Sequence, residues 1–254
     1  MTLLRSILFL FSLLLLTPPF SLIALLTFPL PALLRFRVIS YWSRIALWLL
    51  RVLCGIRYEV RGREHIPATP AIILSKHQSA WETLAFQQIF PPHVWVMKRS
   101  LLLVPFLGWG LAMLRPIAID RDAGREALKQ VTDQGRDRLK RGLWIVIFPE
   151  GTRVVPGNTG RYGIGGAWLA THSGAQVLPV AHNAGEFWGR NTLRKLPGTI
   201  TVSIGAPIDP AGMKPAELNE KVQAWIETEM LKIQAPGAGH QASGEVGARH
   251  ASPE

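Results

Sequence analysis

The chain begins with a long apolar stretch that has to be removed from water. Residues 6–34 contain no charged side chain, and basic residues lie on both sides of the stretch, Arg5 before it and Arg35 after it. A run of this length can span a bilayer. A secretory signal peptide is the alternative, but no small-x-small cleavage site closes the apolar region, which continues past Pro18 and Pro19. The stretch therefore predicts a membrane-embedded segment.

Prolines complicate a straight membrane-spanning helix here. Pro18 and Pro19 lie within the stretch, and Pro29 and Pro31 lie near its end. An interior proline kinks or ends a helix, because it lacks the backbone N–H and its ring clashes with the preceding turn. Two arrangements therefore stay open: a helix that spans the bilayer, and a bent or re-entrant helix pair buried in one leaflet.

A second apolar segment, residues 38–55, predicts another helix. Arg44 and Arg51 are seven residues apart and share one face, while Trp42 and aliphatic residues populate the others. Basic residues and tryptophan on an amphipathic helix are typical of the membrane interface. A helix that docks on a soluble domain would show the same pattern. We predict membrane-anchoring helices over residues 1–56.

Charge and cysteine content narrow the class of protein. The net charge is +11, the hydrophobic content is 48%, and there are nine tryptophans. Excess positive charge suits an anionic membrane surface or phosphorylated substrates as well as nucleic acid. No nucleic-acid-binding motif is present, so we expect no nucleic-acid partner. Cys54 is the only cysteine, which excludes an intramolecular disulfide and a zinc–cysteine cluster, and we expect no metal.

From Arg57 onward, short β-branched runs alternate with segments of helical periodicity. This order predicts an α/β domain over residues 57–234, a sheet with helices on its faces. Residues 235–254 are rich in Gly, Ala and Ser and predict a disordered tail. The expected strands cover residues 58–62, 72–75, 93–98, 116–119, 143–148, 176–181 and 199–204, and the expected helices cover residues 80–90, 123–141, 167–172 and 216–233.

Polar side chains follow the predicted strand 72–75, at the position where open α/β sheets place their sites. His77 can act as a general base, and Glu82 can orient its ring. Five residues is too far for contact along one ideal helix, so the two meet only if His77 lies in the strand-to-helix turn and Glu82 in the first helical turn. Ser79 and Glu82 also form a Ser-x-x-Glu capping box. The spacing alone supports a catalytic pair and a helix cap equally.

A second polar stretch, residues 148–153 (Phe-Pro-Glu-Gly-Thr-Arg), follows the predicted strand that ends near residue 148. Pro149 stops the strand ladder, and Gly151 permits a tight turn or a close backbone approach. Arg153 offers a planar fork of donors suited to phosphate. A strand-end turn with a surface arginine is the alternative.

Together these stretches resemble the signature blocks of a known family. His77-x-x-x-x-Glu82 and residues 148–153 resemble the first and third blocks of the glycerophospholipid acyltransferases, in particular the 1-acyl-glycerol-3-phosphate acyltransferases. Residues 98–121 are similar to the second block and residues 177–180 (Val-Leu-Pro-Val) to the fourth, in the family's order. The resemblance covers roughly residues 57–233. It implies the glycerolipid acyltransferase fold, a mixed sheet flanked by helices, with an N-terminal membrane-embedded helical segment.

The resemblance also implies a reaction. His77 takes a proton from the free hydroxyl of lysophosphatidic acid, which attacks an acyl thioester, and Glu82 holds the imidazole as the third group of a Ser-His-Asp triad does. The product is phosphatidic acid. No protein nucleophile is needed, and no cofactor is expected beyond the acyl donor, acyl-CoA or acyl-ACP. Backbone N–H groups near Gly151 are candidates for the oxyanion. The expected substrate-binding residues are Glu150, Gly151, Thr152 and Arg153, with Lys98 and Arg121 as helpers.

Two positions depart from the family pattern. The family usually has Asn before the histidine, and this chain has Lys76. The family usually ends the first block in Asp, and this chain has Glu82. Glutamate keeps the charge, and its extra methylene still allows the carboxylate to reach the imidazole with a different geometry.

Three further interpretations stay open on the sequence. In the first, the enzyme acylates another lysophospholipid. In the second, it acylates an ornithine-type lipid. In the third, the protein is a non-catalytic lipid-binding relative. The expected partners are membrane lipids, lysophosphatidic acid, and a thioester of coenzyme A or acyl carrier protein. The expected location is the inner (cytoplasmic) membrane, with the catalytic domain facing the cytoplasm.

Overall fold

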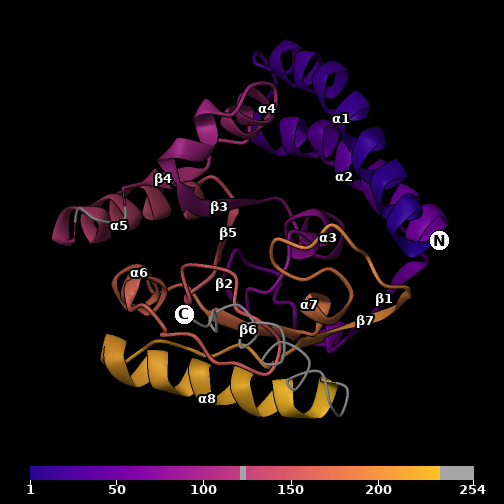
Figure 1. Cartoon of the computed structure of the whole chain (residues 1–254). Coiled ribbons are helices and arrows are strands. Elements are labelled where there is room, and N and C mark those ends of the chain that lie inside the picture. Colours follow the sequence, from indigo (N-terminus) through magenta and orange to yellow (C-terminus); the bar gives the residue numbers. More distant parts are fainter. Residues whose placement is uncertain (121–123, 235–254) are drawn as a thin grey trace, which may run out of the picture.

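A computed structural model describes residues 1–120 and 124–234 of the chain. Arg121 and the tail 235–254, for which the sequence made predictions, lie outside the described residues. The described part contains a pair of N-terminal helices and a sheet with helices on both faces (Figure 1).

The N-terminal helices form an antiparallel pair. Helix α1 spans Thr2–Leu26, α2 spans Ala32–Cys54, and the two pack side by side. Contrary to the expectation from the prolines, α1 continues through Pro18 and Pro19. Hydroxyl groups of α1 donate to carbonyls four residues earlier, as Thr17 does to Leu13 at 2.6 Å. Such bonds give a helix side chain a partner where no water is available.

Seven strands form one mixed sheet in the order β1-β7-β6-β2-β5-β3-β4. All neighbouring pairs are parallel except β6 and β7, which are antiparallel. The strands are β1 (Ile56–Arg61), β2 (Ile72–Ser75), β3 (His93–Lys98), β4 (Ile117–Ile119), β5 (Trp144–Ile147), β6 (Val177–His182) and β7 (Gly198–Ile204). The sequence predicted β2 and β3 to the residue, because apolar runs bounded by prolines or polar clusters mark buried strands clearly.

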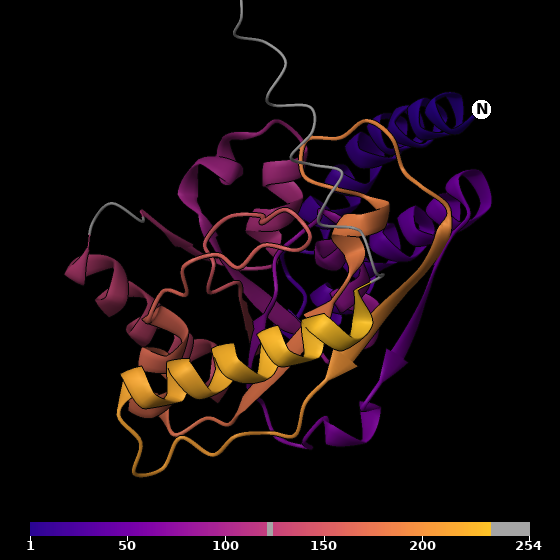
Figure 2. The same ribbon diagram turned by 60° about the horizontal axis from the view of Figure 1, so that its bottom comes forward.

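The two faces of the sheet have separate cores. The core under α2 and α3 includes Ile73 and Trp81, and the core under α5, α6 and α8 includes Ile72 and Leu74. Successive side chains of a strand point to opposite faces, so β2 contributes to both cores. Figure 2 shows α8 lying along the sheet on the side opposite the α1–α2 pair. The helices are α3 (Trp81–Ile89), α4 (Leu107–Met113), α5 (Arg125–Lys140), α6 (Gly165–Ser173), α7 (Ala184–Phe187) and α8 (Pro215–Ile233), with short 3₁₀ turns η1 (Arg63–His65) and η2 (Arg99–Leu103).

The observed elements differ from the predicted ones at a few places. The apolar run after β3 divides into η2 and α4, because Pro105 interrupts it. The short helix α7 had no signal in the sequence. The helix pair is built into the rest of the molecule, since Phe9 of α1 and Leu50 of α2 belong to the same core as Trp81.

Candidate active site

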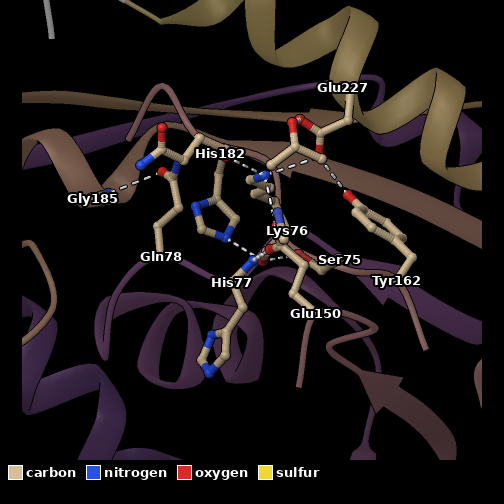
Figure 3. Close-up of polar contacts among 12 residues, drawn as sticks. Ser75, Lys76, His77, Gln78, Glu150, Tyr162, His182, Gly185 and Glu227 are labelled. Atoms are coloured by element: carbon tan, nitrogen blue, oxygen red, sulfur yellow. Dashed lines mark hydrogen bonds and ion pairs between the residues drawn. The ribbon is translucent and has the colours of Figure 1, made fainter. Parts of the chain in front are cut away.

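Three neighbouring strands bring the polar stretches together. Strand β2 lies between β6 and β5 and is parallel to both, so the carboxyl ends of the three lie at the same edge of the sheet. His77 follows β2, the 148–153 turn follows β5, and His182 ends β6. Figure 3 shows His77, Glu150 and His182 around this edge. The open α/β sheet thus places its polar groups where such folds place their sites.

His77 and Glu82 form a direct pair. The Nδ1 atom of His77 lies 2.7 Å from Oε1 of Glu82. A carboxylate oxygen only accepts, so Nδ1 carries the proton and Nε2 is left with its lone pair. The imidazole stacks on Phe148 with ring centroids 4.0 Å apart. The ring is thus held in one orientation and one tautomer, which is what a general base requires.

Glu82 lies in the first turn of α3 and also binds the backbone that precedes this helix. Its Oε1 accepts the backbone N–H groups of Gln78 at 3.0 Å and Ser79 at 2.9 Å. The hydroxyl of Ser79 in turn accepts the N–H of Trp81 at 3.1 Å. The carboxylate that contacts the ring of His77 therefore also binds the backbone just before α3, whose N-cap residue, Ala80, has no side-chain cap.

The Glu82 carboxyl is completely buried, and this environment determines its charge. Burial alone would raise the pKa of Glu82, but the nearby His182 ring and the hydrogen bonds from His77 and Ser79 outweigh it, so its pKa is lowered. His182, whose Nε2 lies 4.0 Å from Oε1 of Glu82, has a partner at each ring nitrogen: the N–H of Ala184 lies 3.3 Å from its Nδ1, and the carbonyl of Lys76 lies 2.9 Å from its Nε2. Burial also lowers the pKa of His182. The site therefore holds an ionised carboxylate behind the base.

A cavity of about 580 Å³ opens beside His77. Its walls are mostly apolar and include Trp95, Phe148 and Trp188, and it extends to Leu13 of α1 and Trp42 of α2. The Trp188 ring packs edge-on against Phe9 of α1 at 5.5 Å. The N-terminal helices therefore form part of the cavity wall, and the cavity leads from the base towards them.

Basic side chains line the same cavity. Lys98 and Arg153, both predicted, are among its lining residues, together with Gly151 and Thr152. Arg190 also lines it and donates from Nη1 to the backbone carbonyl of Arg153 at 3.0 Å. Sequence reasoning missed Arg190 because it belongs to no recognisable motif, and a positive charge in a loop gives no signal by itself.

Glu150 occupies a different place from the one expected of a substrate-binding residue. Its side chain is 0% exposed, and it is not among the residues that line the cavity. Its carboxylate instead accepts a hydrogen bond from the N–H of His77 at 3.0 Å and forms an ion pair with Lys76 at 2.8 Å. The side chain therefore points behind the base rather than towards a substrate.

Gly151 confirms the tight turn, with φ at +68°. Its N–H donates to the carbonyl of Phe148 at 3.0 Å. The N–H of Gly151, which was expected to help stabilise an oxyanion, is therefore already bonded within the turn. Arg121 lies outside the described residues. Within residues 1–120 and 124–234, no group of three or more His, Cys, Asp or Glu side chains is placed to hold a metal ion.

A histidine ring held by a buried carboxylate, beside an apolar cavity with a cationic lining, is an arrangement that can activate a hydroxyl of an amphipathic substrate. Residues 57–183 match the model of the acyltransferase family. The chain belongs to this family.

Named relatives agree with the family assignment. The chain is 51% identical over 208 residues to the 1-acyl-sn-glycerol-3-phosphate acyltransferase of Pseudomonas aeruginosa, covering 80% of this chain and 81% of the relative. It is 28% identical over 202 residues to the 1-acyl-sn-glycerol-3-phosphate acyltransferase alpha of Ovis aries, covering 77% and 70%. The fold matches the crystal structure of the 1-acyl-sn-glycerophosphate acyltransferase PlsC from Thermotoga maritima with a TM-score of 0.77, at 21% identity and over 92% of this chain and 96% of that one.

Proposed function

We propose that this protein transfers a fatty acyl group from a thioester to the free hydroxyl of 1-acyl-glycerol-3-phosphate, which gives phosphatidic acid for phospholipid biosynthesis. The observation that carries the proposal is the orientation of His77. Its Nδ1 is held by Glu82 at 2.7 Å, and the residue lines the large apolar cavity. The names of the relatives supply the acceptor.

The chemistry follows from this geometry. Nε2 of His77 accepts the proton of the acceptor hydroxyl as its oxygen attacks the thioester carbonyl. Glu82 stabilises the imidazolium that forms. When the tetrahedral intermediate collapses, the C–S bond breaks and the imidazolium returns its proton to the thiolate. An ester and a free thiol result, and the enzyme is regenerated without a covalent intermediate.

The cavity is suited to both parts of the acceptor. Apolar walls formed by Trp95, Phe148 and Trp188 favour acyl chains, because burying each methylene is worth about 0.8 kcal/mol. Lys98 and Arg153 provide positive charge for the phosphate, and arginine can bind phosphate with two parallel hydrogen bonds. The donor is the thioester of coenzyme A or of acyl carrier protein. Both present the same reacting carbonyl.

The N-terminal helices support a location at a membrane. In the described part of the chain, α1 alone is long and apolar enough to cross a bilayer. However, α1 packs along α2, and α2 packs against α3 of the α/β part. This arrangement favours a helix pair embedded in one leaflet, because α1 cannot leave α2 without exposing the shared core. We place the enzyme at the inner membrane, with the catalytic domain facing the cytoplasm.

Exposed apolar residues support this placement. Leu14, Leu15 and Leu26 of α1 are 60–79% exposed, and Leu103 and Trp109 near α4 are 81% and 42% exposed. Helix α4 packs against α1, so these side chains lie on adjoining elements. An apolar surface of this extent marks an interaction site, and a membrane fits a surface continuous with a lipid-binding cavity.

A transfer assay with purified protein in detergent tests the function. A labelled acyl thioester is offered with a panel of acceptors: lysophosphatidic acid, other lysophospholipids and an ornithine-type lipid. We expect lysophosphatidic acid to be acylated with the highest kcat/KM. Transfer to another acceptor alone would overturn the acceptor assignment, and no transfer with either donor would overturn the enzymatic function.

A further inference from the structure

The residue before the catalytic histidine carries a buried charge. Lys76 is 0% exposed, although lysine is almost never fully buried without a partner. Its ammonium donates to Oε1 of Glu150 at 2.8 Å, Oε1 of Glu227 at 2.9 Å and the carbonyl of Asn158 at 3.1 Å. These three acceptors match the three donors of an ammonium group. Figure 3 shows Lys76 between the two carboxylates.

Glu150 connects this cation to the backbone of His77. One of its oxygens accepts the N–H of His77 at 3.0 Å, and the other accepts the N–H of Gly160 at 3.0 Å as well as Lys76. The position of the Glu150 carboxylate therefore determines where the peptide group of His77 lies. Movement of Lys76 would move this carboxylate, and the backbone of the base with it.

Glu227 connects the same cation to the C-terminal helix α8. Its Oε1 also accepts the hydroxyl of Tyr162 at 2.7 Å, and its Oε2 accepts the hydroxyl of Thr159 at 2.8 Å. Burial, together with Glu227, raises the pKa of Tyr162 well above its ordinary value, so the phenol stays protonated and donates. One carboxylate thus holds Lys76 and the 159–162 loop together.

The backbone around His77 is fixed by further bonds. The carbonyl of Lys76 accepts from Nε2 of His182 at 2.9 Å, and the carbonyl of His77 accepts the N–H of Val154 at 2.8 Å. Glu82 holds the ring of His77, and Glu150 holds its N–H. His77 is therefore held at its ring by Glu82 and at its backbone N–H by Glu150. Of these two contacts, only the one to Glu150 depends on Lys76.

We propose that Glu227 and Lys76 are positioning residues for acyl transfer: Glu227 on α8 holds Lys76, Lys76 holds Glu150, and Glu150 sets the position of His77. The inference rests on the proposed function, since it assumes that His77 is the base. It also accounts for the lysine at a position where the family usually has asparagine, because Glu227 supplies the charge that a buried lysine needs. A misplaced base lowers the rate of the chemical step more than the binding of the lipid.

The test compares two conservative variants on the same helix. Glu227→Gln removes the charge that faces Lys76, while Glu229→Gln, the control, removes a carboxylate that accepts from Ser203 and Lys232 instead. We expect Glu227→Gln to lower kcat by about tenfold or more with KM for lysophosphatidic acid within about twofold of wild type. Glu229→Gln should keep the wild-type kcat. Melting temperatures report any general loss of stability in either variant.

A double variant tests whether Glu227 acts through Lys76. Lys76→Asn leaves Glu150 and Glu227 close together without a cation, so kcat should fall further than in Glu227→Gln. Adding Glu227→Gln to Lys76→Asn removes the repulsion and should restore part of the lost kcat. If the double variant has no higher kcat than a folded Lys76→Asn protein, the inference is overturned.

Other outcomes separate the inference from the function on which it rests. A Glu227→Gln enzyme with wild-type kcat, or with a raised KM alone, overturns the positioning role even if its melting temperature falls. This result leaves the acyl transfer itself established. A wild-type enzyme that transfers no acyl group overturns the proposed function instead, before any variant is compared.

Discussion

Two adjacent residues at the end of β2 have side chains in opposite environments. His77 faces the cavity with its side chain 15% exposed, and the carboxylate partner of its ring is Glu82. Lys76 is sealed with its side chain 1% exposed, and it has two carboxylate partners, Glu150 and Glu227. Both residues follow β2, and their side chains point in different directions (Figure 3). The strand end therefore presents His77 to the cavity on one side and the ion pairs of Lys76 on the other.

The carboxylates around Lys76 and the carboxylate beside His77 also differ in how many of their oxygens accept a hydrogen bond. Every oxygen of Glu150 and Glu227 has a hydrogen-bond donor. At the cavity side, Oε2 of the buried Glu82 has no hydrogen-bond partner among the described residues. A fully satisfied buried network makes a rigid scaffold. The carboxylates around Lys76 are therefore more completely paired than the carboxylate beside the cavity.

The largest expected effect is the loss of the base. His77→Ala removes the proton acceptor, and we expect kcat to fall by about 10²–10⁴-fold, the range that general-base catalysis supplies. The matched control is His172→Ala, an exposed histidine that stacks on Trp168 and does not line the cavity. Initial rates of acyl transfer measure both. Near-wild-type rates in a folded His77→Ala protein would contradict the general-base role.

The next effect separates the two roles of Glu82. Glu82→Gln removes the charge that stabilises the imidazolium but keeps an oxygen to accept the N–H groups of Gln78 and Ser79. We expect kcat to fall by about 10²-fold or more, since changing the corresponding acid of a triad to its amide costs up to about 10⁴-fold. The fold should persist, as circular dichroism would show.

Glu82→Asp is the sharper companion variant. Aspartate is the usual residue of the family at this position, and we expect substantial activity to remain, within about tenfold of wild type. Unchanged turnover in Glu82→Gln would leave Glu82 with a purely structural role.

A smaller effect is expected at the cationic lining of the cavity. Arg153→Ala should lower kcat/KM for lysophosphatidic acid by about 10- to 100-fold, mostly through KM, because a charge-assisted bond to phosphate is lost. The control is Arg161→Ala, an exposed arginine in the following loop that does not line the cavity. Equal losses for acceptors with and without a phosphate monoester would argue against phosphate binding by Arg153.

The smallest effect concerns the stability of the scaffold with pH. Burial lowers the pKa of His93 from 6.5 to about 4. As pH falls from 6.5 towards 4, the unfolded chain binds this proton and the folded chain does not, so the free energy of unfolding decreases. From pH 7.5 to pH 5 the loss is about 2 kcal/mol, by linkage. Above about pH 7.5 the contribution is complete.

Thermal unfolding at a series of pH values measures this loss. His93→Gln does not titrate and should flatten the dependence of melting temperature on pH between about 4 and 6.5. His172→Gln, at an exposed position, should leave the dependence unchanged. A wild-type slope in His93→Gln would show that other groups carry the acid sensitivity.

The sequence by itself predicted the local features. The strand 72–75 was predicted to the residue, and the 148–153 turn was placed correctly, because short apolar runs ended by polar or proline residues are local signals. The pairing of His77 with Glu82 was also within reach, since five residues connect them across a strand-to-helix turn. Whether Glu82 was a cap or a partner stayed open, because both use the same spacing.

The tertiary structure decided which distant groups meet. Lys76 and Glu227 are 151 residues apart in the chain, and no local pattern relates them. Their contact depends on α8 packing against β6, which lies beside β2. The same holds for the orientation of Glu150 and for Arg190 beside Arg153. Sequence pattern encodes which residues are buried, whereas the strand order and the helix packing determine which charges are buried together, and the latter places the base.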